Sequence, residues 1–375
     1  MKNSSKFNNI TEQKNVLVAP LDWGLGHATR CIPIIDELLR LNCRIFIVAD
    51  GQTFFLLKKE YPQAVFLRCK GYEIRYHRDK RGFALAMYLQ MPKIVFTIFR
   101  EHRWLRRIVK EHQIDAVISD NRFGMYEHNI PCVYITHQLF IKTGSTLSER
   151  IAQKIHYFFI RKFRFCWVPD FRENGLAGSL SHPKRIPDNV IYIGPLSRFK
   201  KMQKVEKAFD LLVSISGPEP QRSIFEKIIS NELKNFEGRS LLLRGLPGED
   251  EVLTPPNPLV TIVNHLPQGE FNKAIEQSGM VICRSGYTSV MDMVKLQKNA
   301  ILIPTPGQTE QEYLAKYLSE KKYFYSENQE GFNLENALKN AAEFPIHFAE
   351  RSGDDYKKTI AEFVLSLKTG NFATQ

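Results

Sequence analysis

Residues 16–30 read Val-Leu-Val-Ala-Pro-Leu-Asp-Trp-Gly-Leu-Gly-His-Ala-Thr-Arg, and this stretch decides the fold class. Its first five residues form an apolar run that is typical of a buried strand, and a turn with two glycines follows. Apolar residues then recur at helical spacing from Ala28 to Leu39. A buried strand, a glycine turn and a helix make the first half of a βαβ unit, so the sequence predicts a parallel sheet.

The same alternation of short apolar runs and helical patterns continues along the chain and restarts near residue 200. The strands expected in the first block lie at 16–20, 44–48, 65–68, 114–119, 132–136 and 190–193. Those expected in the second block lie at 210–215, 240–244, 260–263, 280–283 and 300–303. Two such blocks in sequence predict an α/β protein with two doubly wound, Rossmann-like domains that face a cleft.

The expected domain organisation has five parts. Residues 1–14 are polar and predict a disordered tail, residues 15–198 the N-terminal domain, and the lysine-rich residues 199–207 a linker. Residues 208–350 predict the C-terminal domain, and residues 351–375 a C-terminal helix that packs back on the N-terminal domain.

Length and composition exclude several classes of protein. With 375 residues, 43% hydrophobic and 25% charged, the chain is typical of globular proteins and unlike collagen-like, mucin-like or wholly disordered chains. It has no uncharged apolar run of about 18 residues that would span a bilayer, and its first 14 residues contain no apolar signal segment. The six cysteines are scattered without metal-ligand spacing, so we expect reduced thiols in a cytoplasmic protein.

The positive charge is concentrated in the first half of the chain. Residues 1–200 carry 32 Lys and Arg against 17 Asp and Glu, a net charge of +15, whereas residues 201–375 carry 20 against 23, a net charge of −3. An excess of this size predicts that the first half binds an anionic partner: nucleic acid, a membrane surface or a phosphorylated substrate.

The first chemical motif is the turn that contains Gly24, Gly26 and His27. Its glycines allow the backbone to approach a ligand closely, and the following helix N-terminus attracts a phosphate or a developing anion. Because Thr29 stands where a third glycine would be and no Gly-Lys-Ser/Thr follows, it is neither the dinucleotide fingerprint nor a P-loop. A tight turn with an incidental histidine is the alternative interpretation.

Three further stretches lie in the second block. Residues 214–222 read Ser-Ile-Ser-Gly-Pro-Glu-Pro-Gln-Arg, residues 283–292 read Cys-Arg-Ser-Gly-Tyr-Thr-Ser-Val-Met-Asp, and residues 303–313 read Ile-Pro-Thr-Pro-Gly-Gln-Thr-Glu-Gln-Glu-Tyr. The first predicts a turn and a helix start, and a bare turn is its alternative interpretation. The carboxylates and amides of the other two suit the hydroxyls of a ribose and a sugar, although acidic residues at 310–312 are also typical of a solvated helix start.

Together these features resemble the GT-B glycosyltransferases. The two-block layout, Gly-Leu-Gly-His at 24–27, Arg-Ser-Gly at 284–286 with Asp292, and the glutamine-rich loop at 308–312 are most similar to family 28. That family includes the lipid-intermediate N-acetylglucosaminyltransferase of peptidoglycan synthesis. The resemblance implies that the second domain binds a UDP-sugar, that the first takes the acceptor, and that the reaction inverts the anomeric centre.

The resemblance also implies roles for individual residues. Ser285 and Gly286 would lie against the diphosphate or the base, Asp292 would hold the ribose, and Gln311 with Glu312 would face the donor sugar. The remaining residues expected to bind the donor are Gly217, Arg222, Arg284 and Gln308. The family often has Glu at the position of Asp292, and that transferase carries Gln and Asn where this chain has Glu312 and Ala315, so the donor sugar stays open.

Glycosyl transfer requires a base on the acceptor hydroxyl. We expect His27 to be this base, since an imidazole titrates near neutral pH, and Asp120 at the end of another strand to orient it. The pair resembles the His–Asp pair of plant-type GT-B enzymes. The alternatives are that His27 binds phosphate, together with Gly24 and Gly26, or that His137 serves instead.

No metal or other cofactor is expected. The chain contains no Asp-x-Asp motif that would chelate a metal–diphosphate complex. The charge on the leaving UDP would instead be met by helix N-termini and backbone N–H groups.

Two stretches, residues 72–107 and 154–167, mix aromatic and basic residues. This mixture suits the interface of an anionic bilayer, and it also suits RNA or buried helices with basic outer faces. The resemblance favours the membrane, because a lipid-linked acceptor must be met there. We therefore expect a cytoplasmic protein that is peripheral on the inner face of the cytoplasmic membrane, with nucleic acid not expected as a partner.

The sequence thus predicts an enzyme that moves N-acetylglucosamine or a related hexose from a UDP-sugar to a lipid-linked or glycan acceptor. One alternative is a UDP-sugar 2-epimerase of the same fold, which would release UDP and free sugar. The other is a non-catalytic subunit that binds membrane or RNA, against which Asp292 and Gln311 weigh, because a scaffold has no use for them.

Overall fold

The computed structural model describes residues 13–22, 25–72, 80–142, 145–251, 253–348 and 355–369, and for residues 80–89 it describes the backbone alone. Most of the predicted N-terminal tail, Gly24, and parts of the first aromatic and basic stretch therefore lie outside the described residues.

The first half of the chain forms a sheet of seven parallel strands in the order β3-β2-β1-β4-β5-β6-β7. The strands are β1 (Asn15–Pro20), β2 (Arg44–Val48), β3 (Val65–Leu67), β4 (Ala116–Asp120), β5 (Cys132–Ile135), β6 (Phe165–Val168) and β7 (Val190–Tyr192). The helices that connect them are α1 (Leu25–Arg40), α2 (Gly51–Glu60), α3 (Lys80–Glu111), α4 (Thr146–Ile160) and the short η1 (Gly178–Leu180).

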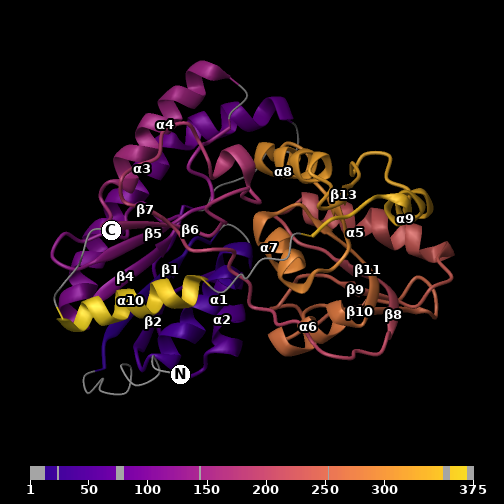
Figure 1. The fold of residues 1–375 in the computed structure, drawn as a ribbon, viewed down its shortest axis with the longest axis horizontal. Coiled ribbons are helices and arrows are strands. Elements are labelled where there is room, and N and C mark those ends of the chain that lie inside the picture. Colours follow the sequence, from indigo (N-terminus) through magenta and orange to yellow (C-terminus); the bar gives the residue numbers. More distant parts are fainter. Residues whose placement is uncertain are drawn as a thin grey trace.

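The second half forms a separate parallel sheet in the order β10-β9-β8-β11-β12-β13. Its strands are β8 (Phe209–Ser214), β9 (Ser240–Leu243), β10 (Val260–Val263), β11 (Ser278–Arg284), β12 (Ala300–Ile303) and β13 (Tyr325–Ser326). Its helices are α5 (Gln221–Glu232), η2 (Leu233–Asn235), α6 (Gln268–Glu276), α7 (Tyr287–Leu296), α8 (Thr309–Glu320) and α9 (Leu334–Glu343). The two sheets lie side by side, each between helices (Figure 1), which confirms the predicted fold class.

The strands read as continuous apolar runs because helices cover both faces of each sheet. Every residue of β4 and β5 is buried, as a parallel strand in the middle of a sheet requires. In the first sheet the side chains alternate between two cores: Val16 and Val18 belong to one, and Leu17 and Ala19 to the other.

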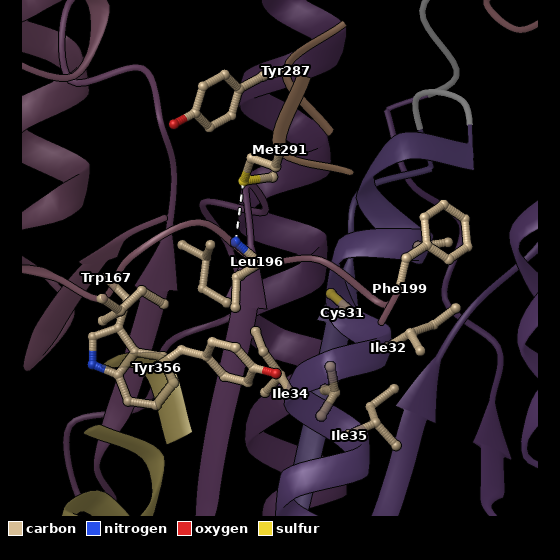
Figure 2. Close-up of a cluster of buried hydrophobic side chains, with 14 of the residues drawn as sticks. Cys31, Ile32, Ile34, Ile35, Trp167, Leu196, Phe199, Tyr287, Met291 and Tyr356 are labelled. Atoms are coloured by element: carbon tan, nitrogen blue, oxygen red, sulfur yellow. Dashed lines mark hydrogen bonds between the residues drawn. The ribbon is translucent and has the colours of Figure 1, made fainter. Parts of the chain in front are cut away.

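The two halves share one hydrophobic core through the segment that leaves the first sheet. Leu196 and Phe199 on this segment are buried between α1 and α7, and the backbone N–H of Leu196 donates to the sulfur of Met291 at 3.2 Å (Figure 2). Since these apolar side chains are covered only when the halves meet, burial of apolar surface holds the two sheets together.

The last helix, α10 (Asp355–Thr369), returns to the first half of the molecule. It lies beside α1 (Figure 1), with Phe363 edge-on to the ring of Trp167 at 5.4 Å between centroids. Tyr356 on the same helix points into the shared core near Trp167 (Figure 2). The chain therefore crosses between the halves twice.

Only part of the second aromatic and basic stretch lies on the surface of the protein. Helix α4 ends at Ile160, and residues Phe165–Val168 form the inner strand β6 between β5 and β7. Phe163 is buried as well, so the exposed residues of this stretch are those on α4 and the two arginines that follow it, Arg161 and Arg164. All six cysteines are buried free thiols, as predicted.

Candidate active site

The carboxyl ends of both sheets meet at the junction of the two halves. In a doubly wound sheet, ligands bind outside the carboxyl ends of the strands where the strand order reverses. That point lies between β1 and β4 in the first sheet, and between β8 and β11 in the second. The hydroxyl of Thr288, at the start of α7, donates to the carbonyl of Gly26 at 3.0 Å, so the two edges are in direct contact.

On the first side, a buried ion pair joins α1 to the end of β4. Arg30 is 2% exposed and Asp120 is fully buried. The guanidinium donates from Nε to Asp120 Oδ2 at 2.6 Å and from Nη2 to Asp120 Oδ1. Burial by itself raises the pKa of Asp120, but the positive charge of Arg30, together with the contact with His27, outweighs it and holds the pKa at about 2.

His27 lies where the sequence predicts, against Asp120, and it also contacts Arg30. Its Nδ1 is 3.2 Å from Asp120 Oδ1 and 2.8 Å from Arg30 Nη2. Burial lowers its pKa, and Asp120 raises it less than burial and the positive charge of Arg30 lower it. The imidazole is therefore neutral at neutral pH, and its side chain remains 17% exposed.

His137, the other histidine singled out in the sequence, bridges the two halves. Its Nδ1 lies 3.0 Å from Arg30 Nη1, and its Nε2 lies 2.6 Å from Glu310 Oε1 at the start of α8. Its ring stacks on that of Tyr287 with centroids 4.3 Å apart. Burial raises the pKa of Glu310, but the neighbouring His137 outweighs it and the pKa is lowered, so Glu310 is ionised.

On the second side, the loops that contain Gly217, Gly286 and Thr305 form an open site around the start of α7, which we call the cradle. A Cβ added to Gly286, the N-cap of α7, would meet open space, and Gly217 adopts a φ of +110° that favours glycine. The Thr305 hydroxyl lies 3.8 Å from the Cβ position of Gly217. It is buried and has no hydrogen-bond partner among the described residues. Helix N–H groups, glycines and an unsatisfied hydroxyl are the elements of an anion site.

The predicted sugar-facing residues hold the loop that precedes α8. Gln311 Oε1 accepts from the backbone N–H of Thr305 at 2.9 Å, and Glu312 Oε1 accepts from Gly307 N–H at 3.0 Å. Gln308 accepts from the Gln311 amide at 2.6 Å, and the Ser285 hydroxyl donates to the Gln311 carbonyl at 2.9 Å. These four residues thus fix one wall of the cradle.

Arg284 lies behind the cradle. It is 1% exposed, and it donates to the Gln221 carbonyl at 3.0 Å and to the Gln329 side chain at 2.6 Å. Within the described residues it forms no ion pair, and burial lowers its pKa to about 9. A buried positive charge with no paired acid favours an anion near the start of α5.

Two predicted donor-binding residues face elsewhere. Arg222 is held by Glu219, which precedes α5, at 2.6 Å and by Glu226 on α5 at 3.1 Å. Asp292 is 6% exposed and accepts from the Ser197 hydroxyl at 2.6 Å, on the segment between the halves. In this arrangement neither side chain is presented to the cradle. The partners of Arg222 are its neighbours in sequence, whereas Asp292 finds its partner on a segment that is distant in sequence.

Arg30, Thr305 and Glu310 were not singled out by the sequence analysis as site residues. Arg30 follows His27 by three residues, which places both on one face of α1, so helical spacing could have found it. Glu310 and Thr305 reach the site through the packing of the two halves, for which a single sequence carries no local signal.

Comparisons with known proteins agree with this arrangement. Residues 268–363 match the model of the glycosyltransferase family 28 C-terminal domain. A protein of Methanosarcina acetivorans named as an uncharacterized glycosyltransferase is 22% identical over 321 residues, 80% of each chain. The UDP-N-acetylglucosamine--N-acetylmuramyl-(pentapeptide) pyrophosphoryl-undecaprenol N-acetylglucosamine transferase of Pasteurella multocida is 23% identical over 322 residues, 83% of each chain. The crystal structure of the glycotransferase of kitacinnamycin has a similar fold, with a TM-score of 0.60 at 13% identity over 96% of each chain.

Proposed function

We propose, from the premise that this chain is a GT-B glycosyltransferase with a family 28 C-terminal domain, that it transfers N-acetylglucosamine or a related hexose. The donor is a UDP-sugar, the acceptor is lipid-linked or a glycan, and the anomeric centre is inverted. The observation that carries the proposal is the open cradle around Gly286, which faces His27 across the junction.

The cradle supports a diphosphate as its ligand. Among the described residues, no side chain caps the N-terminus of α7, the Thr305 hydroxyl has no partner, and Arg284 adds a positive charge without an ion pair behind them. These features make the cradle suited to the charge that develops on the leaving UDP. We propose that this holds without a metal ion, so EDTA leaves turnover unchanged; a loss of turnover that Mg²⁺ restores would contradict it.

Gly286→Ala tests the donor site directly. The new methyl group meets open space in the free protein, so it leaves folding unchanged and occupies only the volume of a ligand. Gly269→Ala on α6, which also meets open space, is the matched control. In a thermal-shift panel of UDP, UDP-sugars and GDP-mannose, UDP compounds are expected to raise the melting temperature of the wild type and the control, but not of Gly286→Ala. Equal shifts in all three proteins would refute the assignment.

Product analysis separates transfer from epimerisation. With UDP-N-acetylglucosamine alone, a 2-epimerase releases UDP and the free sugar epimerised at carbon 2, whereas a transferase accumulates a glycoside only when acceptor is supplied. Nuclear magnetic resonance of the product also reports the anomeric configuration. An epimerised free sugar would favour the alternative activity, and a retained configuration would contradict inversion.

We also propose that an apolar face on α3 and α4 binds an anionic membrane. Large apolar side chains are exposed on both helices. On α3 these include Phe99 at 70% and Phe96 at 66%, and on α4 Leu147 at 68% and Phe158 at 55%. The two helices pack together through Ile94, Ile98 and Phe159. Exposed basic residues lie on and beside this face: Arg103, Arg107, Arg150, Lys154 and Arg161.

This combination supports a peripheral location on the inner face of the cytoplasmic membrane. Aromatic rings insert at headgroup depth, and each basic residue contributes about 1 kcal/mol on an anionic surface. No helix among the described residues is long and apolar enough to cross a bilayer.

Vesicle sedimentation tests the membrane proposal. At low salt, the wild type is expected to sediment with phosphatidylserine vesicles, and Phe99→Ser is expected to bind them more weakly. Leu365→Ser on α10, which removes a side chain that is 45% exposed elsewhere, is expected to bind like the wild type. Absence of wild-type binding, or equal weakening in the two variants, would refute the assignment of this face.

A further inference from the structure

The guanidinium of Arg30 contacts three side chains at once: Asp120, His27 and His137. Beyond its two bonds to Asp120, Nη2 lies 2.8 Å from His27 Nδ1 and Nη1 lies 3.0 Å from His137 Nδ1. A guanidinium has five N–H donors, no acceptor, and stays charged. Both Nδ1 atoms must therefore accept hydrogen bonds, and a neutral imidazole that accepts at Nδ1 carries its proton on Nε2.

This proton position conflicts with a general-base role for His27. A base would need a free lone pair on Nε2 and a proton on Nδ1 that points to Asp120 Oδ1, 3.2 Å away. Arg30 Nη2 is closer to the same Nδ1. A protonated His27 would direct an N–H at this guanidinium. Asp120 compensates only in part, because burial and Arg30 lower the pKa of His27 more than Asp120 raises it.

Glu310 offers the alternative base. Its Oε1 accepts from His137 Nε2 at 2.6 Å, and within the described residues its other carboxylate oxygen has no hydrogen bond. Its side chain is 32% exposed, whereas that of Asp120 is fully buried, so an acceptor can reach Glu310. Helix α8 is held on the first half, since the Ser179 N–H donates to Tyr313 Oη at 2.9 Å.

We propose that Arg30 is a positioning residue that holds His27 and His137 with their protons on Nε2, so that His27 donates a hydrogen bond into the cleft and Glu310 accepts the acceptor's proton. This inference rests on the proposed function. It differs from the assignment of His27 as base that the sequence favoured, and it makes the base a residue of the second half that reaches the site only when the halves meet.

The acceptor oxygen bonds to the anomeric carbon and gives its proton to the Glu310 carboxylate. The bond between the anomeric carbon and the diphosphate oxygen breaks, and its electron pair leaves with UDP. The Nε2–H of His27 donates to the oxygen on which negative charge develops.

The proton positions can be observed without turnover. Nitrogen-15 NMR of the full chain labelled at histidine, with His27→Gln and His137→Gln to assign signals, is expected to show both residues as neutral Nε2–H tautomers. In Arg30→Met the His27 pattern is expected to change, because its Nδ1 is then free to donate to Asp120. A wild-type His27 with its proton on Nδ1 would overturn the proposal.

Turnover then separates the two candidate bases. With UDP-N-acetylglucosamine and water as acceptor, Glu310→Gln is expected to slow UDP release at least about 100-fold, with little change in KM, because the amide still accepts from His137. Glu320→Gln, on the exposed end of the same helix, is the control. His27→Ala is expected to lose about 100-fold, and His27→Gln, which keeps an N–H donor, less than about tenfold.

The outcomes distinguish this inference from the proposed function. If Glu310→Gln turns over like the wild type while His27→Gln and His27→Ala lose activity equally, His27 is the base and the inference fails, although the proposed function stands. If no UDP compound binds the wild type in the thermal-shift panel, the proposed function fails, and the tautomers observed by NMR still decide whether Arg30 positions the histidines.

Discussion

The first half of the molecule brings paired charges to the junction, and the second half brings unpaired polar groups. Asp120 is buried with Arg30, and their hydrogen bonds continue to His27. Opposite them, the Thr305 hydroxyl lacks a partner and Arg284 lacks an acid, within the described residues. The two sides therefore suit different roles. The paired cluster holds reacting groups in fixed positions, whereas the polar groups of the cradle remain available for hydrogen bonds to a ligand.

The largest effect is expected on the paired side. Asp120→Ala leaves the buried charge of Arg30 without its acid, which is expected to lower the free energy of unfolding by about 3–5 kcal/mol. Glu219→Gln, which breaks the contact of Arg222 with a carboxylate that is 56% exposed, is expected to cost less than about 1 kcal/mol. Urea unfolding at neutral pH measures both, and similar losses would show that the Asp120 cluster is no tighter than a surface pair.

Two buried aspartates sharpen the comparison through opposite responses to pH. Because the pKa of Asp120 is lowered to about 2, its stabilisation is present above pH 4 and is lost as the pH falls from about 4 toward 2. Burial raises the pKa of Asp292 to about 6, so the stability it contributes is present below pH 4 and is lost as the pH rises through 6.

Asp292→Asn tests whether ionisation of Asp292 lowers the stability of the fold as the pH rises. The amide keeps an acceptor for Ser197 and cannot ionise, so between pH 4 and pH 7 the variant is expected to gain about 3 kcal/mol relative to the wild type. Urea unfolding across this range measures the gain. A difference between the two proteins that does not change with pH would show that Asp292 ionises in the fold as it does in the unfolded chain.

The smallest effect on stability is expected in the cradle, where the same substitution is expected to raise stability and to weaken UDP binding. Thr305→Val removes a buried hydroxyl that has no partner in the described part of the chain. The variant is therefore expected to raise the free energy of unfolding by about 1 kcal/mol and to weaken UDP binding about tenfold. Ser278→Ala, which removes a buried hydroxyl that donates at 2.6 Å, is expected to lower stability by about 1 kcal/mol without affecting UDP. A destabilised Thr305→Val with normal UDP binding would mean that the hydroxyl has a structural role.

The sequence was sufficient to predict those elements of the fold that depend on neighbouring residues. Strand β1, the glycine turn and α1 follow from the apolar run and the helical spacing of residues 16–39, and repetition of that pattern predicted both sheets. The contact of His27 with Asp120 could also be predicted, because both residues lie at the ends of parallel strands that meet at one edge of the sheet. The inner strand β6 was missed, since its aromatic residues follow a basic helix without a turn signal.

What the sequence by itself determined is therefore the two parallel sheets and the residues at their carboxyl edges, because strand and helix periodicity are properties of neighbouring residues. The tertiary structure alone decided the use of those residues. It placed Asp292 against Ser197 across 95 residues of chain, and it brought Glu310 against His137 across 173. Hydrogen bonds and ion pairs depend on distances of a few ångström between groups, and only the packing of the two halves sets those distances.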